Sequence, residues 1–186
     1  MVNTYKYNDT TQLTDHFNVQ EFRCKCGGSH DILINPELVQ KLEQLHKTLH
    51  CSKIIINSGH RCSAHDIAVK GSGSGQHVSG NAADIVCYDS SGNKISSKII
   101  SCAAQDIGFK GIANIDKQYN ATHVDVRLAG KWLGDEVKTT AYSVTEDFYD
   151  YYDLSKEDVY GSAPADTLEI SITLDGKTYS GTLTAK

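Results

Sequence analysis

The chain has 186 residues, of which 39% are hydrophobic and 22% are charged, and these values favour one globular domain with a small appendage. The formal net charge is -5 and no cluster of Lys or Arg is present, which argues against a nucleic-acid partner. No apolar run approaches the roughly 20 residues of a membrane span, so a membrane is not expected as a partner either. We expect a monomer.

The N-terminus and the cysteines give weaker indications. Residues 1–17 lack the basic start and the apolar block of a secretory signal, so we expect synthesis in the cytoplasm and a separate route of release for any action outside a cell. The 6 cysteines are even in number, but without a secretory signal they predict a disulfide framework only weakly. We expect Cys51, Cys87 and Cys102 to be single buried thiols.

The first predicted elements are helical. Residues 11–22 mix apolar and polar side chains in a pattern that predicts a short amphipathic helix or paired turns. Residues 35–50 predict a clear helix, in which Asn35 is the N-cap, Pro36 takes the first helical position and Glu37 suits the positive end of the helix dipole. The apolar stripe expected to pack on the core consists of Leu38, Leu42, Leu45 and Leu49.

Strands and helices then alternate as far as residue 128. A buried strand is predicted at 53–59, and a short helix follows at 61–71. The next predicted elements, in chain order, are a strand at 82–88, a helix at 94–108 ended by Gly108, and strands at 110–115 and 122–128. Residues 71–76, "GSGSGQ", are flexible by composition. We therefore expect an α+β fold with a small, mainly antiparallel sheet and flanking helices.

The character of the sequence changes near residue 135. We place the main domain at 1–135 and an acidic, tyrosine-rich linker with a C-terminal β-hairpin extension at 136–186. The hairpin is predicted by two alternating runs about an Asp-Gly turn in residues 167–186. The run "EDFYDYYD" at 146–153 favours a solvated linker, although its tyrosines also suit stacking on sugar rings.

Two motifs carry ionisable residues that suit a metal site. In the predicted strand at 122–128, His123, Asp125 and Arg127 alternate onto one face, which is either a solvated polar face or part of a site. In "GQHVSGNAADI", small residues let the chain fold back so that His77 and Asp84 converge. Catalytic zinc takes three ligands of these residue types and leaves a position for water. Taken singly, each residue is more often structural.

Together these motifs resemble the LAS zinc peptidases, in the branch of D-Ala-D-Ala carboxypeptidases and phage L-alanyl-D-glutamate endolysins. The family signature is Ser-x-His, six residues, then Asp, followed by a strand with Val-His-Val-Asp, and it is matched by "GSGSGQHVSGNAADI" and "ATHVDVR". The segment "INSGHRCSAHDIAVKG" looks like the family's Ser-Gly-Tyr-Arg-Cys-Pro-x-His-Asn, and "HFNVQEFRCKCGG" is similar to its opening. The resemblance covers residues 13–130. It implies that the chain has the hedgehog-like fold of these peptidases.

The resemblance implies one catalytic zinc ion (Zn2+) held by His77, Asp84 and His123. It implies that Arg61 binds a substrate carboxylate or polarises the scissile carbonyl, as suits a planar and always charged side chain. The candidate general base is Asp125, which shares the face of His123. The expected substrate-binding residues are Arg61, Ser74, Gln76 and His65, and the alternative for His65 is a helix-surface residue outside the site.

The chain also departs from the family pattern. The serine that normally lies two residues before the first ligand is Gly75, so its role is lost or passes to Ser74. Some branches place an acidic base three residues before the third ligand, where this chain has Asn120, which cannot act as a base. The Tyr and Pro of the arginine segment are replaced by His60 and Ser63.

The implied function is hydrolysis of an amide bond in a peptidoglycan peptide, by a carboxypeptidase or an endolysin-type endopeptidase. A phage lysin that reaches the cell wall after lysis fits this expectation. The alternative is a non-catalytic, zinc-containing module of the same fold that binds the cell wall.

The motif "CKCGGSH" contains further side chains that can bind a metal. Cys24, Cys26 and His30 suit a structural metal site, but the sequence shows no fourth ligand. Free thiols or a disulfide are the alternatives.

Overall fold

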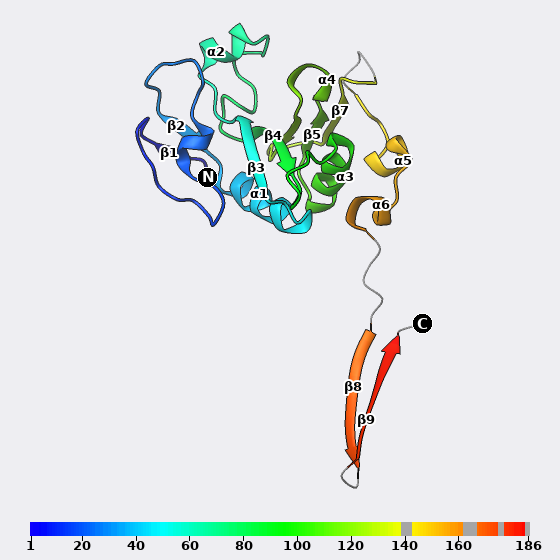
Figure 1. Ribbon diagram of the computed structural model, residues 1–186. Coiled ribbons are helices and arrows are strands. Elements are labelled where there is room, and N and C mark those ends of the chain that lie inside the picture. Colours follow the sequence, from blue (N-terminus) through cyan, green and yellow to red (C-terminus); the bar gives the residue numbers. More distant parts are fainter. Residues whose placement is uncertain (139–142, 162–166, 175–176, 185–186) are drawn as a thin grey trace. The chain divides into compact units, whose positions relative to one another are not determined.

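The structure is a computed structural model that describes residues 1–138, 143–161, 167–174 and 177–184, with side chains described as far as residue 161. It divides into two compact units, Met1–Leu154 and Ser155–Lys186 (Figure 1). Within the described residues, no helix has both the length and the apolar character that a membrane span requires.

A five-stranded sheet forms the centre of the first unit. Its spatial order is β3 (Lys53–Ser58), β4 (Ala82–Tyr88), β6 (Thr122–Asp125), β5 (Gly111–Asn114) and β7 (Trp132–Asp135). All neighbouring pairs are antiparallel except β5 and β7, which are parallel. The predicted α+β class with a mainly antiparallel sheet is thus confirmed. A separate two-stranded sheet pairs β1 (Asn3–Tyr5) with β2 (Ile32–Ile34).

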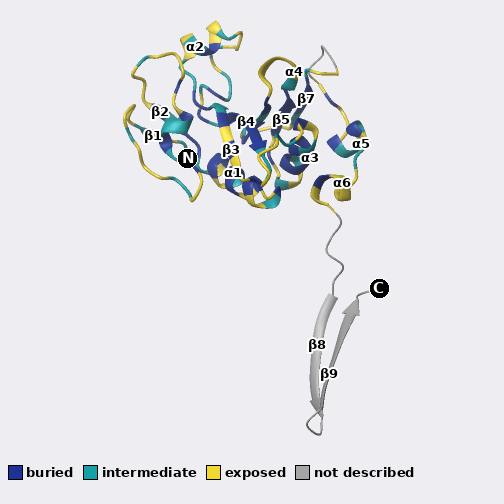
Figure 2. Cartoon of the chain, in the orientation of Figure 1, coloured by how far each residue is buried: buried dark blue, intermediate teal, exposed yellow. Residues whose placement is uncertain are grey.

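Two longer helices cover the sheet and contact each other, α1 (Pro36–Thr48) and α3 (Ser97–Ile107). The predicted start of α1 is confirmed, because the Asn35 side chain accepts a hydrogen bond of 3.0 Å from the backbone N–H of Glu37. The predicted end of α3 is also confirmed, since Gly108 adopts a left-handed conformation with φ of 84°. Buried residues concentrate on β4, β5 and α3 (Figure 2).

Shorter helices complete this part of the unit. They are the 3-10 helix η1 (Val19–Phe22), α2 (Ser63–Ala68) and α4 (Asp116–Tyr119). At η1 the sequence predicted a short helix or paired turns, and Asn18 and Glu21 form a reciprocal capping box there. Figure 1 shows α2 and α4 at the same end of the unit, above the strands.

One strand differs from its prediction. Residues 53–59 were expected to form a buried strand, but β3 lies at the edge of the sheet and alternates between buried and exposed residues. Ile55 is 39% exposed, whereas Ile54 and Ile56 are buried. An edge strand with one face in solvent produces this alternation. The three predicted buried thiols, Cys51, Cys87 and Cys102, are all buried, and none forms a disulfide.

The compact unit continues beyond residue 135. The segment expected to be a solvated linker contains α5 (Phe148–Tyr152), which packs against α3. Phe148 is 0% exposed and its backbone N–H donates to the side-chain oxygen of Gln105 in α3. The Tyr152 hydroxyl donates to Asp135 Oδ2 over 2.9 Å. The aromatic side chains of this segment thus pack in a core. The predicted end of the main functional domain at residue 135 stays a prediction.

Phe148→Ala is expected to lower the free energy of unfolding by about 3–5 kcal/mol, because it removes a fully buried aromatic ring between α5 and α3. Urea denaturation of the full chain measures this change. The control is Leu128→Ala, since Leu128 is 90% exposed and its loss is expected to change stability by less than about 0.5 kcal/mol. Equal effects of the two substitutions would contradict a packed role for α5.

The second unit contains α6 (Lys156–Tyr160) and a hairpin of β8 (Thr167–Leu174) and β9 (Lys177–Thr184). The strands pair antiparallel, from Thr167 opposite Thr184 to Leu174 opposite Lys177. The predicted C-terminal hairpin is therefore confirmed. The Asp-Gly turn on which the prediction rested lies outside the described residues.

Candidate metal centre and substrate pocket

Three donor atoms converge where β4 and β6 pair. Asp84 and His123 lie directly opposite each other in the antiparallel register, and the loop after α2 brings His77 to them. His77 Nε2 lies 3.2 Å from His123 Nδ1 and 3.2 Å from Asp84 Oδ1, and His123 Nδ1 lies 2.9 Å from Asp84 Oδ1. The structure thus brings together the three residues that the sequence predicted as metal ligands.

The donor set fits a tetrahedral zinc ion. Ligand atoms about 2.0–2.1 Å from such an ion lie about 3.3 Å from one another, close to the separations found here. The outer nitrogen of each ring is already bonded, His77 Nδ1 to the Gly59 carbonyl oxygen over 2.8 Å and His123 Nε2 to Asp125 Oδ2 over 3.2 Å. Protonated outer nitrogens direct the lone pairs of the inner nitrogens toward the metal position.

Burial and charge determine the protonation of these ligands. Burial opposes the ionisation of Asp84, but the neighbouring His77 and His123 outweigh it and hold the pKa of Asp84 well below its usual range. Burial also opposes the charged form of His123, yet hydrogen bonds to Asp125 and Asp84 raise the pKa of His123 to about 9. Metal binding at neutral pH therefore has to displace a proton from His123.

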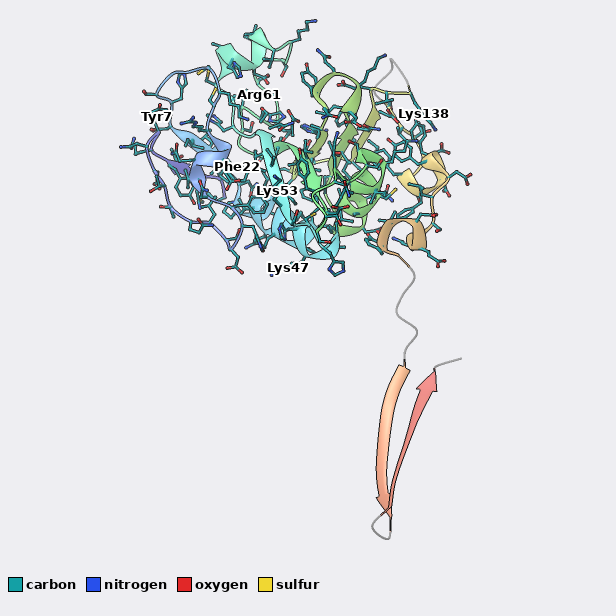
Figure 3. The ribbon with its side chains drawn as sticks, in the orientation of Figure 1. Tyr7, Phe22, Lys47, Lys53, Arg61 and Lys138 are labelled. Atoms are coloured by element: carbon teal, nitrogen blue, oxygen red, sulfur yellow. The ribbon has the colours of Figure 1, made fainter. Side chains whose placement is uncertain are left out.

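Arg61 holds the second oxygen of the aspartate. One terminal guanidinium nitrogen donates to Asp84 Oδ2 over 2.5 Å, and the other donates to Asp66 Oδ1 over 3.2 Å. Its Nε donates to Ser58 Oγ over 2.8 Å. Figure 3 labels Arg61 near α2 at the upper end of the first unit. Because Arg61 occupies Oδ2, Asp84 presents Oδ1 to the two histidines.

Asp125 lies behind His123 rather than beside the open side of the centre. Its side chain is 0% exposed, and its Oδ2 contacts the outer nitrogen of His123. Arg127 also binds it, through the backbone N–H over 3.0 Å and the guanidinium over 2.5–3.2 Å. A methyl group on Gly111 would lie 1.9 Å from Asp125 Oδ2, so β5 also closes over this carboxylate. His123, Asp125 and Arg127, which were predicted to share one face, are thus joined by hydrogen bonds through the carboxylate of Asp125.

A pocket of about 430 Å³ opens over the three donor atoms. Arg61 and His65, two of the predicted substrate-binding residues, line it. Its wall also includes Trp132 of β7, whose ring centroid lies 6.0 Å from that of His123. The remaining lining side chains of polar or charged character are Lys25, Asn57, Ser58, Lys70, Tyr119 and Glu136.

The comparison with protein families agrees with this geometry. The model of the family described as Peptidase M15 matches residues 15–125, which include all three donor residues and Arg61. The chain belongs to the M15 family of LAS-type zinc peptidases. A metallopeptidase acting on a peptide substrate follows from this membership. Neither a curated protein nor a solved structure matches the chain in the corresponding comparisons.

Two residues predicted to contact substrate lie elsewhere in this M15 peptidase. Ser74 and Gln76 are not among the residues that line the pocket. Ser74 is exposed, and its backbone N–H donates to Ser72 Oγ. The side-chain oxygen of Gln76 accepts a hydrogen bond of 3.1 Å from the amide of Asn81. The glycine-rich loop therefore brings His77 to the pocket but leaves these two residues outside its lining.

Glu136 is a pocket residue that sequence reasoning missed. It directly follows β7, and its backbone N–H donates to the Asn114 carbonyl oxygen over 2.9 Å. Partial burial, together with the charge of Asp84, raises the pKa of Glu136, and His123 opposes this shift. No motif marks this glutamate, and it lies beyond both the family match and the predicted domain boundary. Only the parallel pairing of β5 with β7 brings it to the centre.

Proposed function

We propose that this chain is a zinc-dependent peptidase that hydrolyses an amide bond in peptidoglycan peptides, as a carboxypeptidase or an endolysin-type endopeptidase. The observation that carries the proposal is the open triad of His77, Asp84 and His123, whose donor atoms lie 2.9–3.2 Å apart at a pocket. A catalytic zinc site uses three protein ligands and leaves one position open. Membership of the M15 family supports the substrate class.

Zinc bound at this triad would supply Lewis-acid polarisation of the scissile carbonyl and would acidify water beside it. The protein has to take one proton from the attacking water and give one to the leaving amine as the C–N bond breaks. We assign this transfer to Glu136, which lines the pocket and whose pKa is raised by burial. A carboxylate that lines the pocket can accept that proton and return it to the amine.

The geometry favours Glu136 over Asp125 as the base. A general base must reach the proton that it removes, directly or through one water molecule. Asp125 is 0% exposed, does not line the pocket and is occupied by His123 and Arg127. Its hydrogen bond to His123 Nε2 fixes the ring orientation and tautomer of a metal ligand. We therefore propose a positioning role for Asp125 in place of the predicted role as base.

Two cationic side chains of the pocket, Arg61 and Lys70, are candidates for binding a substrate carboxylate. Arg61, predicted for this task, already donates to Asp84, Asp66 and Ser58, so we propose that it positions the metal ligand. Lys70 also lines the pocket, is exposed, and makes no ion pair with any residue whose side chain is described. We propose that Lys70 binds a carboxylate of the peptide. Its long side chain carries a compact charge that suits this contact.

Digestion of purified peptidoglycan tests the function. The enzyme is expected to release new amino termini, and mass spectrometry of the muropeptides identifies the bond that is cut. The control reaction contains the same protein with its metal removed by a chelator. Absence of new termini from peptidoglycans of several chemical types, with zinc bound, would overturn the proposal in favour of the non-catalytic wall-binding module. Action on the wall after release by phage lysis stays a prediction.

A further inference from the structure

A second group of metal-binding side chains lies outside the triad. Cys24 and Cys26 come from the segment between η1 and β2, and Cys62 is the N-cap residue of α2. Their sulfur atoms all lie within 4.8 Å of one another, and Cys26 Sγ is 3.9 Å from Cys62 Sγ. None of the three forms a disulfide. The sequence indicated Cys24 and Cys26, and the fold adds Cys62.

Backbone N–H groups point at two of these sulfur atoms. The N–H of Cys62 donates to Cys24 Sγ over 3.3 Å, and the N–H of Gly28 donates to Cys26 Sγ over 3.3 Å. Between Cys26 and Gly28, Gly27 has a φ of 81°, a left-handed conformation that glycine adopts without strain. Such donors stabilise the thiolate, the form of cysteine that binds metals, although burial outweighs this effect at Cys24 and raises its pKa. The pKa of Cys26 is lowered to about 7, mainly by the Gly28 hydrogen bond and also by the neighbouring Cys24 and Cys62 side chains.

The same loop carries a fourth donor. His30 lies against Gly28, since a methyl group placed on Gly28 would be 2.5 Å from His30 Nε2. The charge of His30 also contributes to the lowered pKa of Cys26. His30 is exposed and lies outside the group of converging sulfur atoms, so the proposal requires its ring to turn toward them. Three cysteines and one histidine form one of the standard closed ligand sets of structural zinc.

We propose that Cys24, Cys26, Cys62 and His30 form a structural zinc site, distinct from the centre at His77, Asp84 and His123. Soft thiolate ligands select zinc over the hard cations magnesium and calcium. A filled set of four protein ligands leaves no position for water, so this ion has no part in hydrolysis. The proposal does not depend on the peptidase activity.

The position of Cys62 next to Arg61 links the proposed zinc site to the other metal centre. Cys62 directly follows Arg61, which holds Asp84 Oδ2 in the other centre. The N-terminal loop that carries Cys24 and the segment that carries Arg61 are far apart in sequence and contact each other here. Within this contact, the N–H of His60 also donates to the Phe22 carbonyl oxygen over 2.8 Å. Zinc would tie the arginine segment to the N-terminal loop and so position Arg61.

Metal analysis of full-length variants tests the proposal without using activity. His77→Ala removes one ligand of the other centre, so it is expected to retain about one zinc ion per chain, against about two in the unmodified protein. Adding Cys26→Ser to His77→Ala is expected to remove the remaining ion. Cys26 is exposed, so this substitution leaves the core intact. Cys51→Ser in the same background is the control for thiols outside the cluster and is expected to retain zinc.

A second measurement identifies the ligands. Cobalt replacing zinc in His77→Ala is expected to show the near-ultraviolet absorption of thiolate-to-cobalt charge transfer, and Cys26→Ser is expected to abolish it. Two results would overturn the proposal. One is a His77→Ala protein that binds no zinc although its circular dichroism shows that it is folded. The other is an intact mass lower by two hydrogen atoms under non-reducing conditions that is not seen in Cys26→Ser, which would identify a disulfide formed by Cys26.

Discussion

His77→Ala is expected to abolish peptide hydrolysis and to lower the zinc content by about one ion per chain. His77 contributes one of three donor atoms that lie 2.9–3.2 Å apart, and two remaining ligands hold zinc weakly. The Gly59 carbonyl oxygen that orients the ring also loses its partner. Elemental analysis of the purified protein and release of amines from peptidoglycan measure the two effects.

His65→Ala is the matched control for the metal content. His65 lines the same pocket but does not belong to the triad, so its removal is expected to leave the zinc content unchanged. If His77→Ala loses one zinc ion but still hydrolyses peptidoglycan at the full rate, the triad is not the catalytic centre. Loss of zinc from His65→Ala would show that the ligand set differs from the one proposed.

Glu136→Gln is expected to reduce kcat by about 10²–10⁴-fold while zinc stays bound. Glutamine keeps the size and most of the hydrogen-bonding capacity of the side chain, but it cannot accept the proton of the attacking water. Since Glu136 is not a member of the triad, its replacement leaves the three donor atoms in place. Turnover of a defined muropeptide, measured together with zinc content, checks both parts of the prediction.

Two further variants separate a base from a positioning residue. Glu37→Gln makes the same chemical change on the exposed first turn of α1, and its kcat is expected to be unchanged. Asp125→Asn is expected to weaken zinc binding about 10–100-fold, and added zinc is expected to restore most of the turnover. The assignment fails if Glu136→Gln has normal turnover and zinc-saturated Asp125→Asn has none.

Part of the pocket wall is formed by residues that lie outside the family match. The match ends at Asp125, whereas Trp132 and Glu136 follow it and line the pocket. Trp132 begins β7 and Glu136 directly follows it, and β7 pairs in parallel with β5 in the same compact unit as the triad. We expect residues 132–136 to influence substrate preference, because they supply part of the pocket wall as well as the proposed base Glu136.

The sequence by itself determined the local features of this protein. Asn35, Pro36 and Gly108 predict helix ends correctly because capping depends on residues within one turn of the helix. The alternation at 122–128 places His123 and Asp125 on one face, since side chains alternate along any strand. The spacing of His77, Asp84 and His123, together with the family resemblance, identified three residues that the fold does bring together.

Only the tertiary structure decided how distant segments meet. The register that places Asp84 opposite His123 is set by pairing between strands that are far apart in the chain. The same sheet buries Asp125 beneath β5 and Arg127, and brings Glu136 to the pocket through β7. Likewise, Cys62 joins Cys24 and Cys26 only because α2 folds onto the N-terminal loop. Local patterns carry no information on such contacts, because they depend on the packing of the whole sheet.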